Sequence, residues 1–135
     1  MKTLLPLVIL VSLLAGCTTA PQGKRARSAE ELRALGQFHA TVDFSGSMAP
    51  LLKGGDELLV TVVPFEQVRV GMVVVYWPHW KPCPVVHLVI AQTKRGFICK
   101  GIDNRDADPE PMTAATFIGK TSRFNQTELL SYASK

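Results

Sequence analysis

The chain has 135 residues, of which 47% are hydrophobic, and a net charge of +4 with histidine neutral. This length is enough for one domain with a modest core, but not for two. The mild positive charge argues against a nucleic-acid-binding protein. The histidines lack the spacing to the cysteines that metal sites show, so the sequence predicts neither a metal nor a cofactor.

The N-terminal segment has the pattern of a lipoprotein export signal. Lys2 precedes a short apolar run, and small residues stand directly before Cys17. The run is too short to stay as a helix across a bilayer about 30 Å thick. We expect cleavage to remove residues 1–16, a lipid to attach to Cys17, and residues 17–27 to tether the domain. The protein would then lie in the cell envelope, on the outer side of the cytoplasmic membrane or at the outer membrane. An uncleaved anchor or an ordinary signal peptide is the alternative.

A short helix is expected directly after the tether. Ser28 is a good N-cap residue, and Glu31 stands three positions later, as in a capping box. Leu32 and Leu35 would form one apolar edge, and Gly36 is a plausible stop. The predicted domain, residues 28–135, therefore begins with a helix of one or two turns.

The rest of this domain is rich in β-forming residues. Segments with many Val, Ile, Phe and Tyr alternate with Gly, Pro, Asp and Asn, which predicts short strands joined by turns. We expect a mostly β fold, a small antiparallel sheet that is partly closed and β-barrel-like, because closure removes aggregation-prone edges. The expected strands cover residues 37–44, 57–63, 72–77, 85–92, 96–100 and 117–124, and a last helical turn or two covers residues 126–133.

The turn between two of these strands bears on the cysteines. If residues 93–96 form a turn, Gln92 faces Phe97 across the hairpin. Cys83 then lies about seven residues beyond the partner of Cys99, at about 3.3 Å for each residue, which is too far for a disulfide. We therefore expect both thiols to be free unless the chain bends sharply at the flanking prolines.

The segment Ser45-Gly46-Ser47-Met48-Ala49-Pro50 is the first candidate for chemistry. Gly46 permits a tight turn that would expose the hydroxyl of Ser47, although Ser and Gly are also common in ordinary polar loops. A serine hydroxyl needs a base to act as a nucleophile. His87 lies inside the apolar segment 85–90, where an imidazole lacks an obvious polar neighbour. The other two histidines, His39 in the first predicted strand and His79 in a loop, can be explained by either exposed or packed roles. A buried structural histidine is the alternative.

A third group would orient the imidazole, as in a catalytic triad. Three carboxylates follow the predicted strand 96–100, at Asp103, Asp106 and Asp108. Turns also favour aspartate, and a surface acid is usually only solvated, so this assignment is open on composition alone.

Taken in order, these residues resemble the signal peptidase I family over about residues 43–119. Residues 45–50 are similar to the family's nucleophile box. Residues 71–76, Gly-Met-Val-Val-Val-Tyr, are similar to its Gly-Asp-Ile-Val-Val-Phe stretch, and His87 stands at the position of the base. Bacterial members usually carry lysine there, whereas members from archaea, the endoplasmic reticulum and some spore formers carry histidine. The chain resembles this histidine branch, and residues 96–108 are similar to its acidic box.

The resemblance implies a serine endopeptidase that cleaves exported or membrane-tethered polypeptides after a small residue. Ser47 would be the acylated nucleophile, and His87 the general base and later the general acid. The Ser45 hydroxyl and the Ser47 backbone N–H would donate to the oxyanion. The expected partners are a polypeptide substrate and, through Cys17, the membrane, and the protein is expected to be a monomer.

The resemblance also assigns the acids. Asp108 would orient His87, Asp103 would be the supporting acid that fixes the loop, and Asp106 is the main rival of Asp108. Three positions depart from the family pattern and loosen these acidic assignments, namely Met72, Leu88 and Ile102.

The departures motivate a second hypothesis from another class. It is a catalytically inactive envelope lipoprotein that keeps the fold and uses the same groove to hold a peptide or a partner. Self-cleavage, as in the related repressor proteases, is less favoured because those proteins use lysine and this chain carries an export signal.

Overall fold

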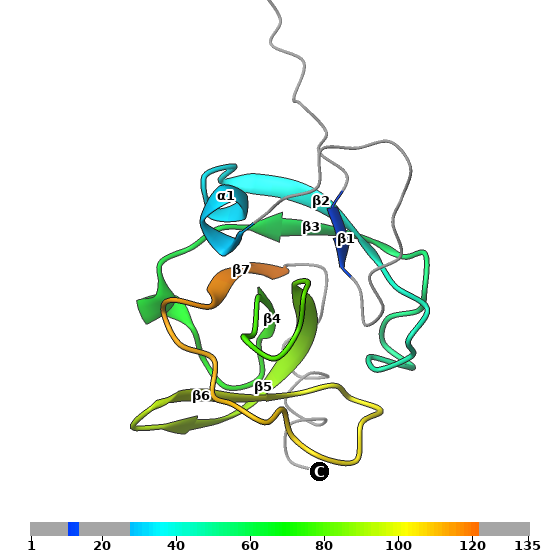
Figure 1. Ribbon diagram of the computed structural model, residues 1–135. Helices are drawn as coiled ribbons and strands as arrows, with labels where there is room; N and C mark the ends of the chain where they lie inside the picture. Colours follow the sequence, from blue (N-terminus) through cyan, green and yellow to red (C-terminus); the bar gives the residue numbers. More distant parts are fainter. Residues whose placement is uncertain (1–10, 14–27, 122–135) are drawn as a thin grey trace, which may run out of the picture.

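A computed structural model describes residues 11–13 and 28–121, and one sheet dominates them (Figure 1). The sheet has seven strands in the order β1-β2-β3-β7-β4-β5-β6. All pairs are antiparallel except that of β1 with β2, which is parallel. The strands are β1 (Val11–Leu13), β2 (Gln37–Val42), β3 (Glu57–Thr61), β4 (Val73–Tyr76), β5 (Val85–Thr93), β6 (Gly96–Lys100) and β7 (Phe117–Thr121).

Helix α1 (Ala29–Arg33) begins where the capping box predicts it. The Ser28 side chain accepts a hydrogen bond of 3.1 Å from the backbone N–H of Glu31, which satisfies one of the free donors of the first turn. The guanidinium of Arg33 donates to the carbonyl oxygen of Phe117 at 2.8 Å, and so ties the helix to β7. Gly36, with φ of 71°, turns the chain from the helix into β2.

The strands bury apolar side chains on both faces of β4. Val73 and Val75 pack in a first cluster with residues of α1, β2 and β3, whereas Val74 and Tyr76 pack in a second cluster with residues of β5, β6 and β7. All four residues of β4 are buried, and the strand lies inside the sheet, between β7 and β5. A short 3-10 helix, η1 (Phe65–Gln67), lies beside the second cluster.

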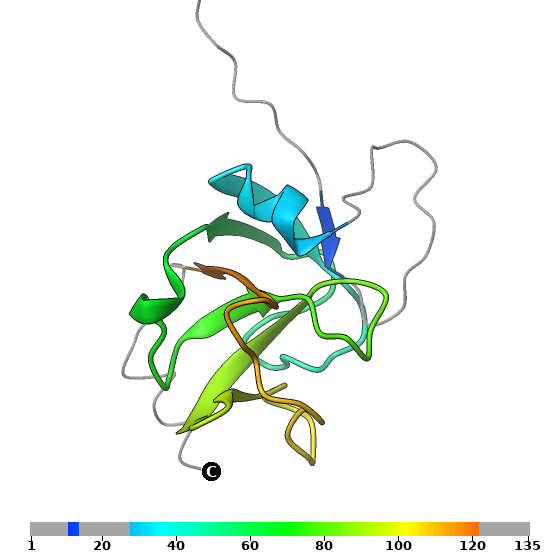
Figure 2. The same ribbon diagram turned by 60° about the vertical axis from the view of Figure 1, so that its left-hand side comes forward.

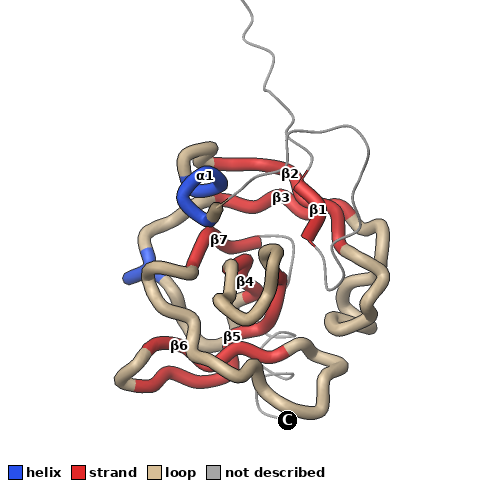
Figure 3. Tube along the Cα trace, in the orientation of Figure 1, coloured by secondary structure: helices blue, strands red, loops and turns tan. Residues whose placement is uncertain are grey.

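The predicted fold class is confirmed: the described chain is mostly β, antiparallel apart from β1, with one short α-helix. Each of the six predicted strands is present. Three of them, β2, β3 and β4, are shorter than expected, β5 is one residue longer, β6 has the expected bounds, and β7 reaches the end of the described residues. The sheet curls strongly (Figures 2 and 3) but stays open, because β1 and β6 end the order of described strands without pairing to each other. The curl brings loops from distant parts of the sequence together.

Two local predictions are also tested by the strand register. Gln92 faces Phe97 in the β5–β6 hairpin, as expected. Cys83 and Cys99 are both buried, and no disulfide joins them. The expected helical turns over residues 126–133 lie outside the described residues, as do Cys17 and the tether. Within the described segments, no helix has the length and apolarity to cross a membrane.

Candidate active site

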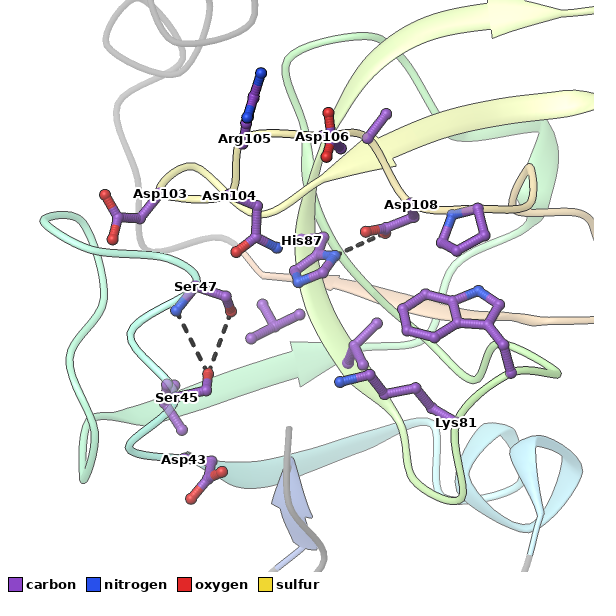
Figure 4. A pocket seen from close by; sticks show the side chains of 16 residues that line it. Asp43, Ser45, Ser47, Lys81, His87, Asp103, Asn104, Arg105, Asp106 and Asp108 are labelled. Atoms are coloured by element: carbon purple, nitrogen blue, oxygen red, sulfur yellow. Dashed lines mark hydrogen bonds and ion pairs between the residues drawn. The ribbon is translucent and has the colours of Figure 1, made fainter.

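A pocket of about 510 Å³ lies where the turn after β2, the strand β5 and the loop after β6 meet. Figure 4 shows the side chains that line it. Every residue that the sequence singled out as a candidate for chemistry in the domain contributes to its wall, namely Ser45, Ser47, His87, Asp103, Asp106 and Asp108. Ser45 and Asp108, sixty-three positions apart in the sequence, therefore line one pocket.

A glycine and two buried side chains shape the turn that presents Ser47. Gly46 has φ of 74°, a conformation that residues with a Cβ rarely adopt, and its carbonyl accepts a 3.1 Å hydrogen bond from the N–H of Ala49. Met48 and Leu52 are buried in the first cluster, with 2% and 1% of their surfaces exposed. The turn is thus anchored by its apolar residues, while Ser47, directly before Met48, faces the pocket (Figure 4).

His87 reaches the pocket from the middle of the sheet. It pairs with Val74 of β4, and only 5% of its surface is exposed. Its Nδ1 lies 2.7 Å from Oδ2 of Asp108, and the two side chains are 6% and 4% exposed. A carboxylate accepts, so Nδ1 carries the proton in the neutral ring, and Nε2 is left as the basic nitrogen. In Figure 4 this second nitrogen faces the side of the pocket that holds the two serines.

The loop after β6 carries all three candidate acids, but only one meets the imidazole. The backbone N–H of Asp108 donates to the Cys99 carbonyl at 2.8 Å, which ties the main chain at this residue to β6. The side chains of Asp103 and Asp106 point elsewhere, and both residues are exposed (Figure 4). The geometry favours Asp108 over Asp106 as the partner of His87.

Asp103 contributes through its backbone. Its N–H donates to the carbonyl oxygen of Ser47 at 2.9 Å, so the acidic loop holds the serine turn directly. Gly101 makes this approach possible, since a Cβ there would lie 2.7 Å from the same Ser47 oxygen and 2.5 Å from Nδ2 of Asn104. The contact between the two loops therefore depends on a residue without a side chain.

Ser45 and Ser47 form a close pair. The Ser45 hydroxyl lies 3.4 Å from Oγ of Ser47, and it accepts a hydrogen bond of the same length from the Ser47 backbone N–H (Figure 4). Both contacts are long, so they hold the serines weakly. No hydrogen bond joins Ser47 to His87, although both line the pocket. Catalytic hydrogen bonds are often longer without substrate and tighten when it binds.

Sequence reasoning missed two buried groups near His87. The Tyr76 hydroxyl donates to Oδ2 of Asp108, and the buried Cys99 lies close enough for the Asp108 charge to act on it. Burial, with a further contribution from the Asp108 charge, raises the pKa of the Tyr76 hydroxyl and of the Cys99 thiol well above their usual ranges. From the sequence, Tyr76 looks like an aromatic core residue at the end of an apolar strand. Its hydroxyl, which needs a hydrogen-bond partner when buried, was the one sign of a further role.

Two further lining residues come from the loop between β4 and β5. Trp80 and Lys81 both line the pocket, and Lys81 lies across it from the two serines in Figure 4. The Lys81 ammonium lies 5.4 Å from the centre of the Trp80 ring. Across the described residues, no group of three or more His, Cys, Asp or Glu side chains is arranged to hold a metal ion.

The chain was compared with protein-family models, with curated proteins and with solved structures, and none of the three comparisons finds a match.

Proposed function

We propose that this protein is a membrane-anchored serine endopeptidase of the signal peptidase I type. Its substrates are exported or membrane-tethered polypeptides, which it cleaves after small residues. The observation that carries the proposal is the shared pocket, which both Ser47 and His87 line. Nδ1 of His87 lies 2.7 Å from the buried carboxylate of Asp108. The resemblance of residues 43–119 to that family supports the same assignment.

The chemistry that this arrangement supports is acyl transfer. Ser47 Oγ attacks the carbonyl carbon of the scissile peptide bond while Nε2 of His87 takes the hydroxyl proton. Asp108 stabilises the imidazolium that forms. His87 then gives the proton to the leaving amine, which leaves the acyl group on Ser47. A water molecule, deprotonated by the same nitrogen, releases the acid and restores the serine.

Two donors are available for the charge that develops on the carbonyl oxygen. The Ser45 hydroxyl and the Ser47 N–H lie 3.4 Å apart at the mouth of the turn. Their mutual hydrogen bond is long, so a substrate oxygen replaces it at little cost. Donors fixed in advance in this way stabilise the tetrahedral intermediate by several kcal/mol in serine hydrolases, roughly 3 kcal/mol for a single donor.

One observation favours the second candidate, an inactive envelope lipoprotein that binds a peptide in the same pocket. Ser47 Oγ contacts Ser45 and makes no hydrogen bond to His87. A binding protein would keep the pocket and lack the activated hydroxyl. The two functions differ in whether Ser47 forms a covalent bond.

A serine-reactive phosphonate probe separates these functions. We expect the full chain in detergent to be labelled at Ser47, and labelling to be lost in Ser47→Ala and reduced at least about 100-fold in His87→Ala. His39→Ala and His79→Ala are matched controls, because both histidines are exposed and neither lines this pocket. Cleavage of quenched peptides with alanine before the cut should follow the same pattern. Equal labelling of wild type and Ser47→Ala would leave only the binding function.

A further inference from the structure

Tyr76 is the last residue of β4, and its side chain reaches across to the acidic loop. Only 1% of its surface is exposed, and it packs in the second cluster beside Val85 and Phe117. Its hydroxyl donates to Oδ2 of Asp108. Nδ1 of His87 lies 2.7 Å from the same oxygen. A single carboxylate oxygen therefore accepts from a tyrosine on one strand and from a histidine on the next.

The carboxylate needs such a second contact because its own segment holds it weakly. Asp108 follows three exposed residues, 105–107, and precedes two more, 109 and 110. The Asp108 N–H is tied to the Cys99 carbonyl, but this bond leaves the side chain free to rotate about its own torsions. Tyr76, by contrast, is fixed by pairing on both sides of β4, with Val85 and with Phe117.

We propose that Tyr76 is a positioning residue of this site, which holds the Asp108 carboxylate so that its Oδ2 faces Nδ1 of His87 and keeps the ring proton on Nδ1. The inference rests on the proposed function for its effect on catalysis, but the tautomer of His87 does not depend on it. Tyr76 acts through Asp108 and does not touch the reacting atoms. Two hydrogen bonds to Oδ2 thus link three side chains, from His87 through Asp108 to Tyr76.

The hydroxyl remains a donor over the working pH range. Burial first, and then the Asp108 charge and hydrogen bond, raise the pKa of Tyr76 far above its usual value. The other titratable groups that act on it are Cys99 and Glu110, and both raise the pKa further. A neutral phenol facing an ionised carboxylate is the protonation state in which both hydrogen bonds to Oδ2 form.

The test is Tyr76→Phe, which removes one oxygen atom and keeps the ring in its apolar site. We expect kcat to fall on the order of 10-fold while KM changes less than twofold, because the hydroxyl does not touch substrate. The ¹⁵N shifts of the His87 ring in the full chain should report a rise in the ratio of the Nε2–H to the Nδ1–H tautomer of at least about threefold. Asp108→Asn provides the reference for a lost preference, since the wrong tautomer costs about 10⁴-fold in a serine protease triad.

A double variant guards against a purely structural effect. If Tyr76 works through Asp108, adding Tyr76→Phe to Asp108→Asn should lower kcat by less than about twofold more. A folded Tyr76→Phe protein with an unchanged tautomer ratio and unchanged kcat would overturn the inference, as would a fully additive double variant. A chain that never labels at Ser47 would overturn the peptidase proposal, and the tautomer measurement would still decide the role of Tyr76.

Discussion

Oδ2 of Asp108 lies 2.7 Å from Nδ1 of His87, and both side chains are almost completely buried. A carboxylate in that position fixes the ring orientation and stabilises the imidazolium when His87 takes a proton. The neighbouring acids of the same loop, Asp103 and Asp106, line the pocket but are exposed. This difference between three acids in one loop yields the first prediction.

Asp108→Asn should lower kcat by about 10³-fold to 10⁴-fold with little change in KM, because an amide cannot hold the correct tautomer. Steady-state cleavage of a quenched peptide measures it. Asp106→Asn is the matched control, and we expect it to change kcat by less than about threefold. A larger loss in Asp106→Asn than in Asp108→Asn would reverse the assignment.

Ser45→Ala should lower kcat by roughly 10-fold to 100-fold, somewhat less than the loss of a short oxyanion donor in other serine hydrolases. The reason is the 3.4 Å separation between its hydroxyl and the groups of Ser47, a long contact that holds the hydroxyl weakly. Ser45→Thr keeps a hydroxyl and should retain more activity than Ser45→Ala. Equal rates for the two variants would argue that the hydroxyl plays no part.

Gly101→Ala should destabilise the fold by about 1–3 kcal/mol and reduce activity, because its Cβ would collide with the Ser47 carbonyl and with Asn104. Urea unfolding measures the free energy of unfolding. Gly36→Ala is a useful comparison, since nothing lies within 4 Å of a Cβ there and only the positive φ opposes it. We expect Gly36→Ala to leave the cleavage rate of the folded protein unchanged, and a normal rate in Gly101→Ala would contradict the coupling of the two loops.

Stability should fall as the pH rises into the alkaline range. The raised pKa values of Tyr76 and Cys99 mean that both groups stay protonated in the folded chain, while the unfolded chain loses these protons above about pH 10 and pH 9. The unfolded state then binds fewer protons than the folded state, so the free energy of unfolding decreases with pH, by up to about 1.4 kcal/mol per pH unit for each group. Below about pH 9 the effect is absent.

Urea unfolding under reducing conditions between pH 8 and pH 11 measures this slope. Tyr76→Phe should flatten it above about pH 10, and Cys99→Ala should flatten it from about pH 9. Identical slopes in wild type and both variants would mean that neither group is protonated differently on folding.

The strands could be predicted because segments rich in Val, Ile, Phe and Tyr are bounded by Gly, Pro and Asp, and the helix because Ser28 and Glu31 form a local cap. These signals are local, and the turn that sets Gln92 opposite Phe97 is also specified by a few neighbouring residues. Whether the sheet closes depends on its curl and strand order, which no local pattern specifies. The sheet accordingly remained open between the described strands β1 and β6.

The candidate site divides in the same way. Ser47 and His87 were recognisable because a serine on a glycine turn and a histidine in an apolar strand each stand out in their own segment. The choice among Asp103, Asp106 and Asp108 was open, because the direction of each carboxylate depends on how the loop lies over β5. The role of Tyr76 was not predicted from the sequence, because its hydrogen-bond partner Asp108 is thirty-two positions away and the residue stands at the end of an otherwise apolar strand.

The pairing of β1 with β2 would be lost if the N-terminal segment were cleaved off. Val11–Leu13 lie within the residues that a lipoprotein signal would lose, and they are matched to Ala40–Val42, the stretch of β2 that leads into the serine turn. Signal cleavage would remove β1 from the edge of β2 and leave backbone donors and acceptors of β2 unpaired next to the pocket. The mature protein would then have a free edge on β2, to which an incoming extended chain would add as a parallel strand. In the precursor, β1 occupies this edge.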